Sequence, residues 1–240
     1  MNILVLGASS YLGAQIAMEF SPGNRLILTG RRGEPLEALA SLCLARGASE
    51  ARAVVNDLGA GIGPLLPASQ PWPLDLIIHV ACSTSRLRDH DIKWAAWQDC
   101  VLADVHHPLA LVRAWLDGQP GRALTVCLVS TFLADFRSPG RVVYGALKSL
   151  HEQGLRTALA ENPNLSIRII KLGRTFSRDR ATPSMAVAAK RIRSLVEESG
   201  RERVCAYGLV GKVWEALFFI QPLVFFALNK LQRSLRSAPS

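Results

Sequence analysis

The sequence predicts an α/β fold in which helices cover both faces of a doubly wound parallel sheet. Three observations support that prediction. Short apolar runs alternate with longer helical stretches along the chain, which is typical of parallel strands buried on both faces. The chain opens with an apolar run that leads into a turn of small residues between Gly7 and Gly13. A tyrosine and a lysine, Tyr144 and Lys148, lie one helical turn apart.

Length and composition indicate one folded domain followed by a different kind of segment. The chain has 240 residues, of which 49% are hydrophobic, and a chain of this size can bury a full core. We expect the domain to cover residues 1–208 and an apolar, basic tail to cover residues 209–240. No basic segment precedes the first apolar run, so we expect no signal peptide there.

The first strand is expected at residues 2–6 and the first helix at residues 12–20. Gly7 would let the chain turn sharply off the strand, and Gly13 would let the helix pack close to the sheet. The N–H groups at the start of the helix would then face a pyrophosphate. The candidate cofactor-binding residues of the turn are Gly7, Ser9, Ser10, Tyr11, Leu12 and Gly13. The middle glycine usual in such turns is absent, and an ordinary strand–loop–helix connection is the alternative.

The second strand, expected at residues 25–30, runs into two arginines. In this type of sheet an acidic residue at that point binds the 2′-hydroxyl of the adenosine ribose. Arg31 and Arg32 stand there instead, and guanidinium groups bind phosphate in a bidentate manner. The sequence therefore predicts NADP(H) in preference to NAD(H). The alternative is a pair of solvated arginines on a basic surface.

The remaining elements continue the alternation. Further strands are expected at residues 53–55, 75–81, 124–129 and 166–171. Further helices are expected at residues 35–46, 94–105, 108–116 and 146–160. Glycine and proline mark the loops at residues 59–73, 117–122 and 138–140.

Tyr144 and Lys148 form the candidate catalytic pair. The ordinary pKa of a tyrosine is about 10, which is too high for easy proton exchange at neutral pH. A nearby ammonium favours the phenolate and lowers that pKa, so the tyrosine becomes a usable general acid or base. The spacing alone is modest evidence, and it gains weight from the strand and turn at the N-terminus.

In these motifs the chain resembles the short-chain dehydrogenase/reductase family, a Rossmann-fold family that binds NAD(P), over residues 1–190. Asp57 and Leu58 resemble the family's adenine-contacting Asp-Leu pair, and Ala81 ends a segment similar to its fourth strand. The resemblance implies that Lys148 also holds the nicotinamide ribose. It further implies that Thr175 contacts the nicotinamide amide.

Several positions depart from the family pattern. The family's catalytic serine would fall on Thr131, which follows Ser130. Either hydroxyl could bind the substrate carbonyl, and both remain candidates. Asp104 stands where the family has an asparagine that kinks the fourth helix and holds a proton-relay water. Leu172 replaces a proline. The segment His79-Val80-Ala81 is closer to the extended, sugar-nucleotide branch of the family.

The resemblance implies reversible hydride transfer between NADPH and a small-molecule carbonyl. Tyr144 would give the proton, and Ser130 or Thr131 would hold the carbonyl oxygen as charge develops. Two other classes stay open. One is an epimerase or dehydratase of the extended branch with tightly bound cofactor, which His79 favours. The other is a non-catalytic NADP(H)-binding protein, which the departures at Tyr11, Asp104 and Leu172 keep open.

Charge and cysteine content narrow the partners. The formal net charge is +9, but no nucleic-acid-binding signature accompanies it. The charge therefore suits an anionic cofactor, an anionic substrate or a membrane surface rather than nucleic acid. The five cysteines show no zinc-type spacing, so we expect buried free thiols and no metal. The adjacent His106 and His107 would point to different helix faces. A homo-oligomer is expected, because this fold commonly pairs through its helices.

The C-terminal run at residues 213–228 is apolar and aromatic, and Pro222 interrupts it. A membrane span needs about 20 apolar residues, so we expect helices lying in a membrane interface, flanked by Lys230, Arg233 and Arg236. The alternative is a helix packed on its own domain or across a dimer. This layout resembles membrane-associated envelope-sugar reductases such as that of decaprenylphosphoryl-ribose epimerisation, which implies a keto-sugar on a lipid carrier. The expected location is cytoplasmic, peripheral on the inner face of a membrane.

Overall fold

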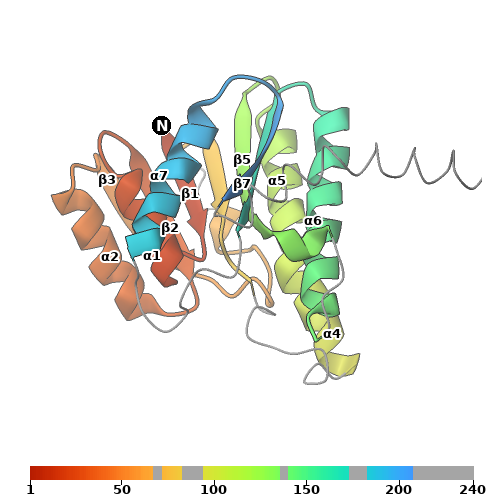
Figure 1. Ribbon diagram of the computed structural model, residues 1–240. Coiled ribbons are helices and arrows are strands. Elements are labelled where there is room, and N and C mark those ends of the chain that lie inside the picture. The colour runs from red at the N-terminus through yellow and green to blue at the C-terminus, as the bar shows by residue number, and fades with distance from the viewer. Residues whose placement is uncertain (67–71, 83–93, 136–139, 173–182, 208–240) are drawn as a thin grey trace, which may run out of the picture.

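The computed structural model describes residues 1–66, 72–82, 94–135, 140–172 and 183–207. Strands and helices alternate along these ranges (Figure 1). The strands are β1 (Asn2–Leu6), β2 (Arg25–Gly30), β3 (Glu50–Val55), β4 (Leu76–His79), β5 (Leu124–Thr131), β6 (Leu165–Leu172) and β7 (Glu202–Tyr207). The α-helices are α1 (Tyr11–Glu19), α2 (Gly33–Ala45), α4 (Trp94–Val101), α5 (His107–Gly118), α6 (Val142–Glu161) and α7 (Pro183–Glu197). A π-helical turn, η3 (Leu102–His106), joins α4 to α5, and a 3₁₀ turn, η4 (Phe132–Ala134), follows β5.

The seven strands form one sheet in the order β3-β2-β1-β4-β5-β6-β7. Every neighbouring pair is parallel. The strand order reverses between β1 and β4, and in such sheets ligands bind beyond the carboxyl ends of the strands at that point. The predicted doubly wound parallel α/β fold is therefore confirmed.

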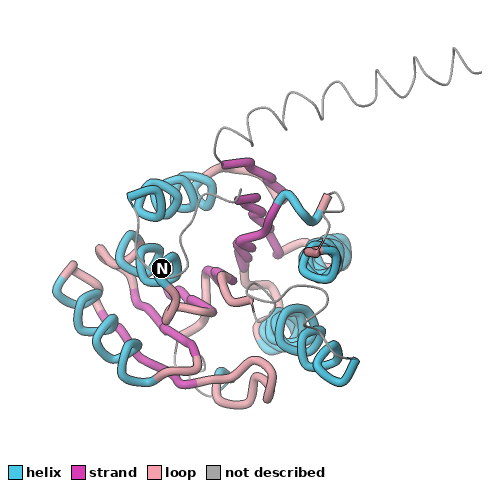
Figure 2. Tube along the Cα trace, turned by 60° about the horizontal axis from the view of Figure 1, so that its bottom comes forward, coloured by secondary structure: helices cyan, strands magenta, loops and turns pink. Residues whose placement is uncertain are grey.

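Helices lie on both faces of the sheet (Figures 1 and 2), and an apolar layer fills the space on each face. On one face, residues of β1 and β2 such as Ile3 and Leu28 join Ile16 of α1, Leu36 of α2 and Ile192 of α7. The second layer lies on the opposite face, where alternate strand residues meet α5 and α6; its members include Leu4, Val126, Ile169, Val112 and Leu155. Residues of one strand alternate between the two layers because successive side chains point to opposite faces.

The last helix and strand, α7 and β7, are absent from the elements predicted from the sequence. The strand β7 lies at the sheet edge and pairs only with β6. It carries Glu202 and Arg203, and Val204 is exposed, so it lacks the continuous apolar run of an interior strand. An edge strand of this composition gives a weak signal in the sequence.

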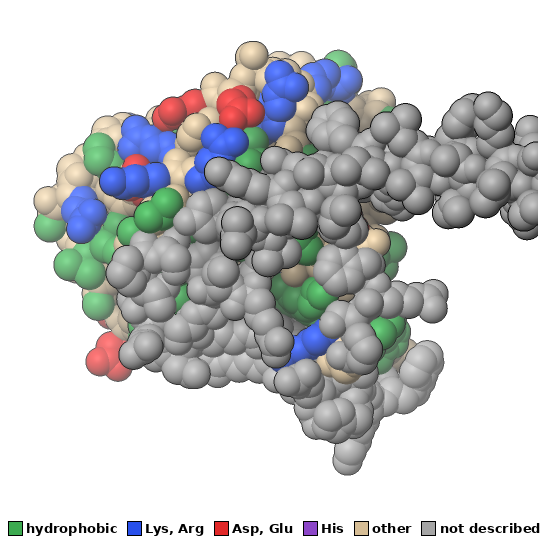
Figure 3. Space-filling view, viewed as in Figure 1, with side chains coloured by type: hydrophobic (Ala, Val, Ile, Leu, Met, Phe, Trp, Pro, Cys, Tyr) green, Lys and Arg blue, Asp and Glu red, His purple; other side chains and the backbone are tan. Residues whose placement is uncertain are grey.

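Basic and acidic side chains alternate over the upper edge of the molecule (Figure 3). Among the described residues of α7 and β7, Arg193 pairs with Glu197, while Arg191 and Arg203 both lie near Glu198. Exposed ion pairs of this kind contribute little to stability.

No helix in the described ranges is long and apolar enough to cross a membrane. The predicted interfacial segment, residues 213–236, lies outside those ranges. The domain boundary predicted at residue 208 lies at their end and stays a prediction.

Candidate active site

The turn after β1 requires glycine at two positions. Gly7 has φ = +90°, and a Cβ built on it would lie 2.7 Å from the backbone nitrogen of Ala81. A Cβ on Gly13 would collide with the carbonyl oxygen of Gly7. Both contacts are with backbone, so neither can relax by a side-chain movement. The first helix thus packs tightly over the carboxyl ends of β1 and β4.

Ser10 begins α1 as its N-cap. Its hydroxyl accepts a hydrogen bond from the N–H of Gly13 (3.0 Å) and donates to the carbonyl of Gly7 (2.8 Å). This cap fixes the helix N-terminus at the edge of the sheet where β1 ends. Helix N-termini favour anions through their N–H groups and dipole. Ser9 and Leu12 flank the cap, and Tyr11 is exposed.

The arginines after β2 lie beside this turn. Arg32 donates from Nη2 to the carbonyl of Ser9 (3.0 Å), and both Arg31 and Arg32 are exposed. After β3, the carboxylate of Asp57 accepts from the N–H of Gly59 (3.0 Å), and Leu58 is half-buried. The donor set at this edge fits a dinucleotide with an additional phosphate, because the guanidinium of Arg32 lies beside the capped helix N-terminus and Arg31 is its neighbour in the chain.

Tyr144 and Lys148 lie on α6, near the carboxyl end of β5. Tyr144 is half-buried, whereas Lys148 is buried and donates from Nζ to the carbonyl of Val129 (3.1 Å). Burial by itself lowers the pKa of Lys148, but the nearby Cys82, Tyr144, Asp104 and Glu152 outweigh it and raise the pKa overall. Lys148 is therefore an ammonium held beside the Tyr144 phenol.

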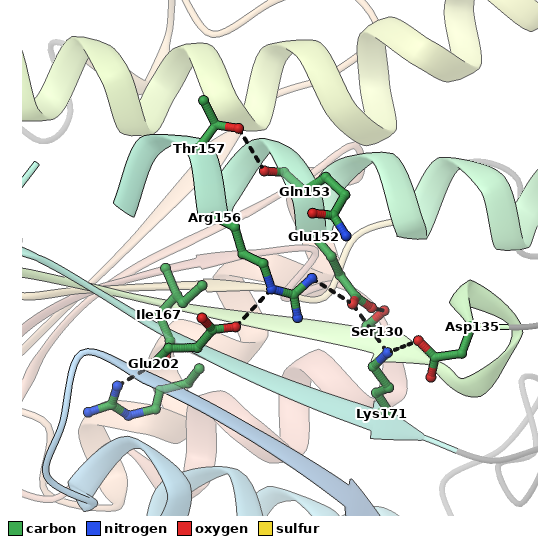
Figure 4. A network of polar contacts seen from close by, with 10 residues as sticks. Ser130, Asp135, Glu152, Gln153, Arg156, Thr157, Ile167, Lys171 and Glu202 are labelled. Atoms are coloured by element: carbon green, nitrogen blue, oxygen red, sulfur yellow. Dashed lines mark hydrogen bonds and ion pairs between the residues drawn. The ribbon is translucent and has the colours of Figure 1, made fainter. Parts of the chain in front are cut away.

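Ser130 belongs to a polar network that connects α6 with the neighbouring strands (Figure 4). Its hydroxyl donates to Oε1 of Glu152 (2.5 Å), and Oε2 of Glu152 lies 3.2 Å from Nζ of Lys171. Lys171 also pairs with Asp135, which follows η4. Arg156 lies 3.6 Å from Glu152 and bonds Glu202 of β7 at 2.8 Å. The network joins α6 to β5, β6 and β7.

Thr131 has a different environment from Ser130. It ends β5, and its Oγ1 accepts from the N–H of Leu133 (3.3 Å) at the start of η4. An accepted hydrogen bond leaves the hydroxyl proton for another acceptor. The Ser130 hydroxyl, in contrast, donates its hydrogen bond to a buried carboxylate, that of Glu152. The two candidates left open by the sequence are therefore chemically distinct.

Asp104 lies within the π-turn η3, at the position of the family's kinking asparagine. A single π-turn inside a helix often marks a functional position. The buried carboxylate of Asp104 accepts from Sγ of Cys82 (3.4 Å), and its backbone carbonyl bonds the ring of His151. The carbonyl freed by the π-turn thus has a side-chain partner from α6.

A pair of buried histidines beneath Lys148 was not predicted from the sequence. The ring centroids of His79 on β4 and His151 on α6 lie 4.8 Å apart, and each residue is 1% exposed. Burial and the nearby Lys148 lower the pKa of His151 to about 3. Burial, followed by the charges of His151 and Lys148, holds the pKa of His79 well below its ordinary value. The signal in the sequence that could have predicted the pair was a histidine at the end of the apolar strand β4 and another one helical turn after Lys148.

The two histidines should make the fold acid-sensitive. Both stay neutral when folded but protonate near pH 6.5 when unfolded. Their contribution to the free energy of unfolding is therefore fully present above pH 6.5 and is lost as the pH falls below it. Between pH 7 and pH 5 we expect a loss of about 2 kcal/mol for each ring. Urea unfolding at both values measures it.

His151→Gln should remove about half of this histidine contribution. The matched control is His106→Gln, because His106 is exposed on the neighbouring turn. Equal acid sensitivity of the wild type and His151→Gln would contradict the assignment.

The remaining predictions concern Thr175, the cysteines and metal binding. Thr175, expected at the nicotinamide amide, lies outside the described residues. All five cysteines are free thiols, and four of them are buried as expected; Cys82 is half-buried. In the described part of the chain, no three His, Cys, Asp or Glu side chains gather where they could hold a metal ion. His107 contacts the carbonyl of Leu58 through Nδ1 (2.5 Å).

No family model matches the sequence, but curated proteins do. A hydroxysteroid 11-beta-dehydrogenase 1-like protein of Danio rerio is 27% identical over 185 residues, which cover 72% of this chain and 63% of that protein. The protein of the same name from Xenopus tropicalis is 26% identical over 246 residues, covering 94% of this chain and 82% of that protein. The match to the Danio rerio relative thus spans less than two thirds of that protein.

Solved structures share the fold. A short-chain dehydrogenase from Streptomyces avermitilis superposes with a TM-score of 0.78 at 21% identity, covering 99% of this chain and 98% of that one. A metagenomic short-chain oxidoreductase in complex with NADP superposes with a TM-score of 0.72 at 20% identity, covering 87% and 97%. The comparisons confirm that the chain resembles the short-chain dehydrogenases/reductases. The enzyme class of these neighbours is the one expected from the sequence.

Proposed function

We propose that the chain is an NADP(H)-dependent oxidoreductase that interconverts a carbonyl and a secondary alcohol. The observation that carries this proposal is the Tyr144–Lys148 pair. A half-buried phenol stands beside a buried ammonium at the edge of the sheet where ligands bind in this fold. An ammonium so placed favours the phenolate and makes the tyrosine a proton donor and acceptor near neutral pH.

Each residue of the site then has a separate task. In reduction Tyr144 gives its proton to the carbonyl oxygen, and in oxidation it takes the proton from the alcohol. Thr131 holds the oxygen as negative charge develops on it. Ser130 orients Glu152 instead of touching substrate, because its hydroxyl donates its hydrogen bond to that carboxylate. Lys148 stabilises the phenolate and contacts the nicotinamide ribose.

NADPH, when bound, supplies the hydride. The residues that would hold it are the turn from Gly7 to Gly13, with Arg31, Arg32, Asp57, Leu58, Ala81 and Thr175. The support is the donor set beside the turn, together with structural neighbours that are described as complexes with NADP or a modified NADP. The glycine turn admits a pyrophosphate, and the arginines suit the additional 2′-phosphate.

The proposed substrate class is based on the names of similar proteins. The names of the curated relatives refer to hydroxysteroids, and one structural neighbour is an angucycline ketoreductase. We propose an apolar or lipid-linked ketone, with keto-sugars on a lipid carrier included. A homo-oligomer and contact between residues 213–236 and a membrane surface complete the proposal, and both come from the sequence alone.

A cofactor titration tests the proposal. Purified protein is titrated with NADPH and NADH while nicotinamide fluorescence is followed, in the wild type, Arg31→Ala and Arg32→Ala. Loss of a charge-assisted contact should weaken NADPH binding about tenfold to a hundredfold in at least one variant and leave NADH binding unchanged.

The matched control is Arg113→Ala, which removes an exposed arginine of α5 that pairs with Asp117 and Glu161. It should bind NADPH as the wild type does. Failure of the wild type to bind either nucleotide would overturn the oxidoreductase proposal. Equal weakening for both nucleotides would overturn only the choice of NADP(H).

A further inference from the structure

The buried histidine pair leaves polar atoms without partners. Within the described part of the chain, neither ring nitrogen of His79 has a hydrogen-bond partner, nor does Nδ1 of His151. The other ring nitrogen of His151 bonds the carbonyl of Asp104. A neutral imidazole carries one donor and one acceptor, and leaving such groups dry inside a protein costs free energy. Buried polar atoms of this kind normally bind internal water.

The pair lies between the sheet and α6. His79 pairs in register with Leu6 of β1 and Leu128 of β5. His151 faces it from α6, with the two rings tilted by 46°. The position is one helical turn below Lys148, on the same helix. The unpartnered nitrogens of the pair therefore lie near the base of the candidate catalytic lysine.

Charged and titratable groups face Lys148 from every element around it. Cys82 follows β4, Asp104 comes from η3, and Tyr144 and Glu152 come from α6 itself. The carbonyl of Val129 on β5 accepts its hydrogen bond. His79 and His151 both lie within electrostatic range of the ammonium. Each neutral imidazole carries both a donor and an acceptor, so a water bound to it can be oriented as an acceptor or as a donor.

We propose that His79 and His151 hold internal water against Lys148, and that this hydrated pair solvates the ammonium while Tyr144 gains and loses its proton. A water on an imidazole can donate or accept a hydrogen bond. It can therefore compensate the change in charge on Tyr144. The two histidines are positioning residues, and their role rests on the proposed function of Tyr144.

The test measures the pH midpoint at which Tyr144 ionises. Tyrosinate absorbance is titrated in the wild type and in histidine variants, each corrected with its own Tyr144→Phe version. His79→Leu and His151→Leu remove the water-binding nitrogens and should raise the midpoint by about one pH unit. His79→Gln and His151→Gln keep donors and acceptors and should restore it. NADPH titration shows that each variant is folded.

Trp115→Phe is the matched control. The indole nitrogen of Trp115 on α5 is also buried without a partner, but Trp115 is not among the groups that act on Lys148. Its variant should leave the midpoint unchanged. Leucine variants with the wild-type midpoint, or glutamine variants that shift it as far as leucine does, would overturn the proposal.

A second measurement uses the unaltered protein, so it stands if the leucine variants fail to fold. Imidazole N–H signals of ¹⁵N-histidine-labelled protein should show cross-relaxation with water for His79 and His151. Absence of water contact at both rings would overturn the proposal. The failures separate cleanly: a wild-type Tyr144 that ionises only near the ordinary value of about 10 defeats the proposed function. If Tyr144 ionises well below pH 10 and the histidine variants leave that midpoint unchanged, only the proposal of the hydrated pair is overturned.

Discussion

Tyr144→Phe is expected to lower turnover by at least about a hundredfold, because it removes the proton donor while keeping the ring. Phenylalanine fills the same space, so NADPH binding and folding should stay close to those of the wild type. The measurement is kcat with any ketone that the wild type reduces, alongside the dissociation constant for NADPH. A change in kcat without a change in cofactor affinity identifies a group that acts on the reacting atoms.

The control removes a hydroxyl elsewhere on the same helix. Thr157 of α6 is exposed, and its hydroxyl bonds only the carbonyl of Gln153 within the helix. Thr157→Val should turn over as the wild type does. Full turnover by Tyr144→Phe with every substrate would refute the assignment of Tyr144 and, with it, the proposed reaction.

Lys171→Met is expected to lower the free energy of unfolding by about 3 kcal/mol or more. Lys171 is buried between the carboxylates of Asp135 and Glu152 (Figure 4). Without the ammonium, the ion pair that Glu152 keeps within the described residues is the one with Arg156 at 3.6 Å, and two carboxylates face each other. A charge left buried without its partner is costly, whereas the intact pair contributes little. Denaturant unfolding at neutral pH gives the difference.

Two further variants make this result specific. Lys171→Arg keeps the positive charge and should recover most of the loss. Arg113→Met breaks ion pairs whose arginine side chain is 68% exposed, so solvent screening should limit its effect to less than about 1 kcal/mol. Lys171→Met with the stability of the wild type would show that the carboxylates are relieved in another way.

The fold class could be predicted from the sequence because its signals are local. The interior strands β1 and β2 contain unbroken apolar runs, and β5 is largely apolar, which is the composition of buried parallel strands. The turn after β1 is marked by Gly7 and Gly13. The edge strand β7 escaped prediction because pairing on one side places weaker demands on sequence.

The candidate site could be predicted in part. The spacing of Tyr144 and Lys148 places both on one helix face without knowledge of the rest of the chain. Arg31 and Arg32 after β2, and Asp104 in the expected fourth helix, could also be singled out by their positions in the sequence. These features depend on neighbours within one turn or one loop, which is the range over which sequence patterns are informative.

What the sequence determined by itself was the class of fold, the glycine turn and the Tyr144–Lys148 pair. The tertiary structure alone decided which hydroxyl meets the buried carboxylate, because the pairing of β5 with β6 sets Ser130 beside Lys171. It alone brought His79 and His151 together from a strand and a distant helix. Contacts between elements depend on strand register and helix rotation, which many long-range interactions fix together, so no local pattern specifies them.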